Sequence, residues 1–310
     1  APNITEAFSP RSPGFVNITD PCDQNNIDND PNRRENCAAL GVPDDFESNT
    51  NVSIDLISGG NPNLDPEESD SLTAGFVWTP EFIENFSATI DYYDIEITDA
   101  ITFIAPQTVI NNCVDSESGI NNNFCSQVTR GSDSQLTAVE SGYLNAASLE
   151  TSGVEMELNY QTELGALDLP GSLSTSLFVN HLIDFVNFPF QDQPEQDNVN
   201  TGQVGDPEWQ FRFTANYRLD DLTVSWATRF IDRSALYDVT PRLEAYENLE
   251  PAYVGSMFTH DLSAGYSFTE NFRISGGVRN IFDKVPPGYT GNALYDLTGR
   301  RAFINATYEF

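Results

Sequence analysis

Four cysteines are the residues of this chain whose chemistry is the easiest to interpret. Cys22 and Cys37 are fifteen residues apart, and Cys113 and Cys125 are twelve apart. Both pairs lie in segments rich in Asn, Asp and Ser. Four cysteines allow three pairings, but two close pairs in loops favour two local disulfides, which need an oxidising compartment. Zinc is the competing interpretation, and it is disfavoured because the spacings are not of the C-x₂-C type and the chain has only two histidines.

Five arginines are a second group of residues that could bind a ligand or a partner. They occupy the polar positions of segments in which apolar and polar residues alternate: Arg212, Arg229, Arg273, Arg279 and Arg301. Alternate residues of a strand share one face of a sheet, so these side chains would lie on one face. Either an acidic element of a partner covers them, or nearby carboxylates such as Glu155 and Glu157 pair with them. An anion pore is the third alternative, and the acidic connecting segments argue against it.

Aromatic residues in the long polar segments are candidates for ligand contact, because a ring can cover the apolar face of a sugar while nearby Asp and Asn bond its hydroxyls. Packing within the loops is the alternative for each of them. The candidates are Tyr237, Tyr246, Tyr253, Tyr289 and Tyr295. Further loop aromatics are Phe124, Tyr143, Phe188 and Phe190.

No pattern in the chain indicates an enzyme. A Gly-rich phosphate loop, H-E-x-x-H and G-x-S-x-G are all missing from the sequence. Chance pairing is expected among 47 acidic residues, so carboxylate pairs do not indicate a glycosidase. The acidic run 23–30 could hold Ca²⁺, but it lacks the EF-hand spacing and a solvated loop is favoured. We therefore predict no catalytic residue, no metal site and no cofactor.

Composition excludes one class of partner. The net charge is −33, with 47 acidic residues against 14 Lys and Arg, and nucleic acid requires a basic face. An acidic, solvated surface is the plain interpretation of this charge. No run approaches the roughly 18–20 apolar residues of a membrane helix. The chain has no initiator Met and no signal peptide at its start, so we expect a processed product or a fragment.

Strands with a two-residue period must position these side chains. In the last segment, Ala302, Ile304, Ala306, Tyr308 and Phe310 are apolar and alternate with mostly polar residues. About nine such strands are predicted, joined alternately by short and long connections. They cover residues 71–78, 86–97, 154–160, 173–179, 211–217, 222–230, 258–268, 272–279 and 300–310.

This alternation is typical of an all-β transmembrane antiparallel barrel in a bacterial outer membrane, where tight turns face the periplasm and long loops lie outside. A Greek-key sandwich does not show it. Bacterial barrels have even strand numbers, and open edges are not tolerated in lipid, so nine strands predict the carboxy-terminal portion of a larger barrel. We divide the chain into a long extracellular loop region with a probable disulfide (1–68) and barrel strands with long extracellular loops (69–310).

An ordered set of short motifs resembles TonB-dependent outer-membrane receptors. The motifs cover residues 1–8, 60–67, 69–71, 91–95, 151–155, 280–287, 299–301 and 308–310. The resemblance implies a barrel of about 22 strands, a plug domain in its lumen, and a box that binds TonB, whose energy drives import. This chain carries neither plug nor box, so the arginine row would face the missing plug. Ile304, Ala306, Tyr308 and Phe310 resemble the signal read by the barrel-assembly machinery.

The predicted function is import of a nutrient by this family. The cysteine-bearing loops resemble a subgroup linked to oligosaccharides, which makes an oligosaccharide the favoured substrate. A ferric-siderophore receptor of the same family is one alternative. A passive porin-like barrel or surface receptor without active transport is another, and a secreted soluble β-domain that binds glycans is the third. The predicted partners are therefore TonB, the plug, the assembly machinery, outer-membrane lipid and a small nutrient.

Overall fold

The computed structural model describes residues 1–310 except 50–52, 192–196, 237–252, 289 and 291–293. The chain divides into two compact units. The first contains Ala1–Glu68, Thr98–Ala147 and Pro189–Asp192, and the second contains Ser69–Ile97, Ser148–Phe188 and Gln193–Phe310. None of the described helices is both long enough and apolar enough to cross a membrane.

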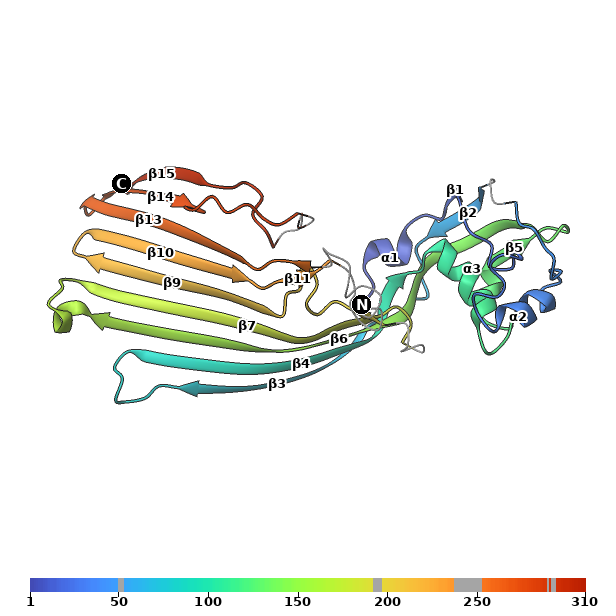
Figure 1. Cartoon of the computed structure of the whole chain (residues 1–310), viewed down its shortest axis with the longest axis horizontal. Helices are drawn as coiled ribbons and strands as arrows, with labels where there is room; N and C mark the ends of the chain where they lie inside the picture. Colours follow the sequence, from blue (N-terminus) through green and yellow to red (C-terminus); the bar gives the residue numbers. More distant parts are fainter. Residues whose placement is uncertain (50–52, 192–196, 237–252, 289, 291–293) are drawn as a thin grey trace. The chain divides into compact units, whose positions relative to one another are not determined.

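The second unit is built from long strands that lie side by side in one sheet (Figure 1). Neighbouring strands follow the order of the chain. Within the described residues, the long strands from β6 to β15 pair with one another in antiparallel fashion. The strands are β3 (Glu68–Trp78), β4 (Phe86–Phe103), β6 (Leu136–Glu163), β7 (Ser172–Phe188), β9 (Trp209–Leu219), β10 (Leu222–Ile231), β13 (Met257–Thr269), β14 (Phe272–Arg279) and β15 (Arg301–Tyr308). Each of them lies over one of the nine predicted segments, so this prediction is confirmed.

The connections in this unit alternate between short and long, as predicted. The β9–β10 turn consists of two residues, and its Asp220 has a φ of 47°, in the left-handed region that Asp tolerates better than most residues. A single turn of 3₁₀ helix, η2 (Leu164–Leu167), lies between β6 and β7. Short strands lie in the longer connections: β8 (Asn198–Val199) pairs with β7, and β11 (Ser234–Ala235) pairs with β12 (Tyr253–Val254).

The two faces of the sheet differ in polarity. Apolar side chains continue from strand to strand on one face: Leu158 lies opposite Leu177, and Leu177 lies opposite Phe213. Nearer the end of the chain, Trp226 lies opposite Leu262 on the same face. Large apolar side chains of β13 stay exposed there, with Phe268 58% exposed. An apolar face this extended needs an apolar environment, which lipid supplies in an outer membrane.

The edges of this sheet show that the barrel is not closed within the described residues. There β3 pairs only with β4, and β15 pairs only with β14. Each edge therefore presents unpaired backbone N–H and C=O groups on one side. Further strands must satisfy these groups in a membrane, which agrees with the expectation of a larger barrel.

The first unit has its own secondary structure. Its helices are α1 (Ile4–Phe8), α2 (Arg33–Ala39), α3 (Pro106–Asp115) and the 3₁₀ turn η1 (Cys125–Gln127). Its strands are β1 (Ser12–Val16), β2 (Ile54–Gly59), β5 (Val128–Arg130) and the first part of β6. The pairing of β2 with β6 is parallel, unlike the antiparallel pairs of the second unit. Residues 1–68 were expected as a long loop region, and about 104–147 as a long connecting segment. In the structure, the described residues of 1–68 and 98–147 form a folded lobe.

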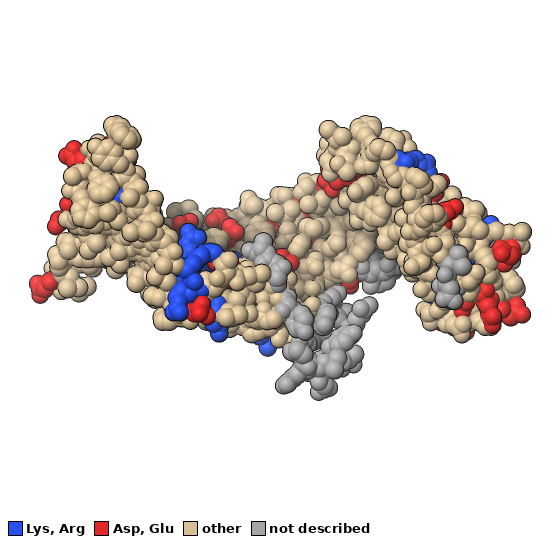
Figure 2. Space-filling model, turned by 90° about the horizontal axis from the view of Figure 1, so that it is seen from above, with Lys and Arg blue, Asp and Glu red and all other residues tan. Residues whose placement is uncertain are grey.

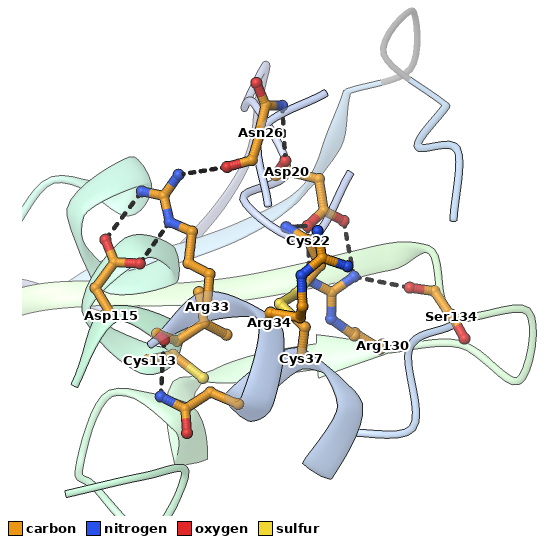
Figure 3. The surroundings of a disulfide bond; sticks show 12 residues. Asp20, Cys22, Asn26, Arg33, Arg34, Cys37, Cys113, Asp115, Arg130 and Ser134 are labelled. Carbon is orange, nitrogen blue, oxygen red and sulfur yellow. Dashed lines mark hydrogen bonds and ion pairs between the residues drawn. A yellow bond between two sulfur atoms is a disulfide. The ribbon is translucent and has the colours of Figure 1, made fainter. Parts of the chain in front are cut away.

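Two disulfides lie in the core of this lobe. Cys22 is bonded to Cys37, with a Cα–Cα distance of 5.7 Å (Figure 3). Cys113 is bonded to Cys125, with a Cα–Cα distance of 4.5 Å. This is the local pairing that the spacing favoured. Cys22, Cys37 and Cys113 are almost completely buried and pack with Phe46.

Two ion pairs with mostly buried side chains also lie within the lobe. Arg130 donates two hydrogen bonds of 2.7 Å to the carboxylate of Asp20, whose side chain is only 3% exposed. Arg33 binds the carboxylate of Asp115 in the same two-pronged way, at 2.5 and 2.9 Å (Figure 3). This bonding raises the pKa of Arg33. Both pairs join residues that are more than 80 positions apart, so they hold distant parts of the lobe together.

Candidate functional site

A hollow of about 680 Å³ opens on the polar face of the second unit. Four arginines from four strands line it, namely Arg212 of β9, Arg229 of β10, Arg279 of β14 and Arg301 of β15. All four side chains belong to exposed residues. Figure 2 shows a band of Lys and Arg on one face of the molecule, with a few Asp and Glu beside it. We call the four residues the arginine cluster.

The register of the sheet places these arginines in directly opposed pairs. Arg212 lies across from Arg229, and Arg279 lies across from Arg301. Like charges that face each other across a strand pair are unfavourable, so the sheet alone gives no reason for either pairing. An anion bound between the guanidinium groups would relieve the repulsion.

The arginine cluster occupies one end of the strands. The β9–β10 turn at Asp220 lies at the other end of those strands from Arg212 and Arg229. Arg279 is the last residue of β14, and Arg301 is the first residue of β15. All four therefore lie at the ends from which the long connections leave.

Two carboxylates share the hollow with the four arginines. Asp296 forms an ion pair of 2.6 Å with Arg301. Hydrogen bonds from the Thr298 hydroxyl and backbone N–H, together with Arg301, lower the pKa of Asp296. Asp261 accepts a 2.8 Å hydrogen bond from the backbone N–H of Asn280. Among the residues that the structure describes, Arg301 is the only member of the arginine cluster in an ion pair, so positive charge remains in excess.

Neutral side chains complete the lining. Asn180 and Gln210 supply amide donors from β7 and β9. Phe178 lies opposite Arg212 and is 39% exposed. The guanidinium of Arg279 lies 5.8 Å from the ring centre of Phe303. Guanidinium groups bind carboxylates and phosphates through paired hydrogen bonds, so the hollow has the chemistry of an anion site.

The remaining member of the predicted arginine row lies elsewhere. Arg273 shares the polar face but lies near the tight-turn end of β14, where it makes a long hydrogen bond of 3.5 Å to Ser267. The two glutamates expected as possible partners of the five arginines bond to amides instead. Glu155 accepts from Asn180 at 3.5 Å, and Glu157 accepts from Asn159 at 2.8 Å. Within the described residues, neither glutamate pairs with an arginine, and a plug-facing role stays a prediction.

The structure describes two of the five tyrosines that were predicted to contact a ligand. Tyr237, Tyr246 and Tyr289 lie outside the described residues. Tyr253 is 40% exposed, with the guanidinium of Arg233 4.9 Å from its ring centre. Tyr295 is 4% exposed and packs in a small apolar core, where burial raises the pKa of its hydroxyl. Tyr253 remains available to a ligand, whereas Tyr295 serves loop packing.

Other loop aromatics also pack within the protein. Phe124 and Phe190 meet edge to face at 5.7 Å, and Tyr143 meets Phe103 in the same way at 5.4 Å. They stabilise the first unit.

The acidic run 23–30 uses its carboxylates to hold the chain. Asp23 accepts hydrogen bonds from the backbone N–H groups of Asn25 and Ser48. Burial raises the pKa of Asp23, but these hydrogen bonds outweigh it and leave the pKa lowered. The described part of the chain contains no group of three or more His, Cys, Asp and Glu suited to a metal ion.

The final strand presents its apolar row outward. Ile304 is 82% exposed and Tyr308 is 58% exposed. The rings of Tyr308 and Phe310 lie 5.1 Å apart, edge to face, and Ala306 lies between Ile304 and Tyr308 on the same face. A role in barrel assembly stays a prediction.

These features define a class of protein. One sheet with an apolar face, a polar face, tight turns at one end and long connections at the other is the architecture of an outer-membrane β-barrel. The model of the TonB dependent receptor-like, β-barrel family matches residues 1–281. The chain belongs to this family, whose members are outer-membrane proteins.

Solved structures of similar fold are receptors and transporters. A variant of the ferric enterobactin receptor from Pseudomonas aeruginosa has a TM-score of 0.56 at 16% identity over 84% of this chain. The siderophore receptor PirA from Acinetobacter baumannii has a TM-score of 0.51 at 16% identity over 84% of this chain. The FrpB iron transporter from Neisseria meningitidis (F3-3 variant) has a TM-score of 0.51 at 16% identity over 82% of this chain. The search of curated proteins found no match.

The matched region is a fraction of those proteins. This chain covers 33% of the enterobactin receptor, 34% of PirA and 33% of FrpB. At identities this low, the likeness establishes the fold and leaves the substrate open.

Proposed function

We propose that this chain forms part of the barrel of a receptor that imports a nutrient across the bacterial outer membrane with energy from TonB. The family match over residues 1–281 carries this proposal. The sheet supports it, because its apolar face suits lipid and its polar face suits a water-filled or plugged lumen. The partners are a plug domain, TonB, the barrel-assembly machinery and a small solute. The activity is transport without catalysis.

The nutrient is a ferric siderophore or an oligosaccharide. The cysteine-bearing loops favoured an oligosaccharide. The arginine cluster favours a negatively charged solute over a neutral one, and the similar structures are named as siderophore or iron receptors and transporters. A ferric siderophore therefore fits at least as well as a sugar.

Uptake by whole cells tests the proposal. The complete polypeptide that carries this chain is produced in the outer membrane of cells with and without a working TonB complex, and accumulation of labelled oligosaccharides and ferric siderophores is measured. We expect accumulation of one class only when TonB works. Equal uptake in both strains would indicate a passive barrel instead. Lack of uptake, with the protein folded in the outer membrane, would contradict the importer.

A further inference from the structure

The arginine cluster carries positive charge that the described residues neutralise only in part. Fourteen Lys and Arg stand against 47 acidic residues in the whole chain, yet four of the fourteen line a single hollow. Within it, these arginines outnumber the aspartates Asp261 and Asp296 by two. Folding has placed cations together despite an excess of available anions, which is costly unless something negative joins them.

The described residues supply little charge that could neutralise the cluster. Asp296 forms an ion pair with Arg301, and Asp261 accepts a hydrogen bond from the backbone N–H of Asn280. Arg212 and Arg229 lie opposite each other with no ion pair in the described part of the chain, and Arg279 contacts the ring of Phe303. Within the described part of the chain, three guanidinium groups therefore have no carboxylate partner and can bind a ligand.

We infer that the arginine cluster binds a solute that carries at least two carboxylates. This inference rests on the proposed function, because it names the substrate class of the importer. Each guanidinium offers parallel N–H groups, and carboxylates match that geometry in a two-pronged way. The two pairs lie on strands separated by β13, so one carboxylate bound at Arg212 and Arg229 would leave Arg279, which forms no ion pair among the described residues, for a second carboxylate. Asn180, Gln210 and the exposed ring of Phe178 suit the uncharged parts of such a solute.

The position of the cluster favours a solute over a segment of another domain. All four arginines lie at the ends of strands from which the long connections leave, which face outward in this class of barrel. A solute that arrives from outside meets this end first. Two kinds of solute share the required chemistry, namely an oligosaccharide of uronic acids and a ferric chelate of hydroxycarboxylates.

Direct binding to the purified complete protein in detergent tests the inference. The probes are tri-galacturonate, ferric citrate and the neutral trisaccharide maltotriose, each titrated by calorimetry at low and high salt. Arg212→Gln and Arg279→Gln each remove a guanidinium that has no ion pair among the described residues, so neither change strands a carboxylate. Arg273→Gln is the matched control, because Arg273 shares the face but lies at the other end.

We expect at least one carboxylate probe to bind, with weaker binding at high salt. Its affinity should fall about tenfold or more in Arg212→Gln and Arg279→Gln and stay unchanged in Arg273→Gln. Which probe binds distinguishes the two kinds of solute. Equal binding of maltotriose, binding of neither carboxylate probe, or unchanged affinity in both variants would overturn the inference.

A role in holding a domain would give a different result. If Arg212→Gln and Arg279→Gln lower the thermal unfolding midpoint of the complete protein but leave probe affinity unchanged, the cluster binds a protein segment and the inference fails. Binding in detergent does not depend on TonB. A negative binding result would therefore not contradict TonB-driven uptake. A negative uptake result would likewise not contradict a measured affinity.

Discussion

Single residues matter most where a charge is buried. The carboxylate of Asp20 is 3% exposed and is held by Arg130, which is itself 11% exposed. It also accepts a 2.9 Å hydrogen bond from the backbone N–H of Cys22. Removing the cation would leave the carboxylate buried without its partner, which is far more costly than losing an exposed pair.

We expect Arg130→Leu to destabilise the first unit by about 3–5 kcal/mol. Arg34→Leu is the matched control, since Arg34 pairs with Asp28 at 2.6 Å and both side chains are exposed, so this change should cost much less stability than Arg130→Leu. Pulse proteolysis in urea, followed on fragments of the first unit, measures the loss of stability in both variants. Equal losses in the two variants would show that the burial of Asp20 has no energetic consequence.

Asp206 provides a pH-dependent test at the same scale. Burial raises its pKa from the ordinary 3.8, because the ionised carboxylate is less well solvated in the folded protein than in the unfolded chain. The folded state therefore loses stability as pH rises from 3.8 through the raised pKa, and this loss persists at neutral pH.

Asp206→Asn removes the ionised form, and we expect a higher thermal unfolding midpoint than wild type at pH 7. The gain should vanish at about pH 3, where the wild-type carboxyl is protonated. Asp45→Asn, at an exposed residue, controls for the general effect of one less negative charge. A gain of the same size at both pH values would exclude titration of Asp206 as its cause.

At the scale of elements, the strands of the second unit could be predicted because each carries its own two-residue period. Part of the candidate site was predictable in the same way. Arg212 and Arg229 are each eight residues from the Asp220–Asp221 turn, so a tight hairpin must place them opposite each other. The Arg279–Arg301 pair could not be found so simply, because a long connection separates β14 from β15 and no local rule sets their register.

The first unit shows where prediction from sequence ends. Helices α2 and α3 contain seven and ten residues, too short to be stable by propensity alone. Contacts between distant residues stabilise them, such as the bond of Arg33 to Asp115, and a disulfide joins Cys113 in α3 to Cys125. The spacing of the cysteines indicated the bridges but not the helices that they connect.

We expect the double change Cys22→Ala with Cys37→Ala to destabilise the first unit by about 2–5 kcal/mol, because an unbridged chain gains freedom when unfolded. Limited proteolysis should then cut this unit faster, while fragments of the second unit, which contains no cysteine, keep their wild-type rate. Treating the wild type with a reducing agent should reproduce the effect. Faster cutting in the second unit would mean that the bridge supports more than its own lobe.

At the scale of the whole molecule, the function depends on which face of the sheet meets lipid. The register assigns Leu177 to the apolar face, opposite Leu158 and Phe213. Its neighbour Ser176 lies on the polar face, opposite Thr214 and on the same side as the arginine cluster. A charge is costly only on the face that is covered by lipid.

We therefore expect Leu177→Arg to destabilise the barrel of the complete protein by about 2–4 kcal/mol and Ser176→Arg by at most about 1 kcal/mol. Both variants add the same side chain at adjacent positions of β7, so strand propensity and side-chain size at the new residue are matched. Urea titration of the protein folded into phospholipid vesicles, followed by tryptophan fluorescence, measures the difference. If Ser176→Arg is the more damaging change, the faces are reversed, and the arginine cluster would then face lipid, where no carboxylate solute could reach it.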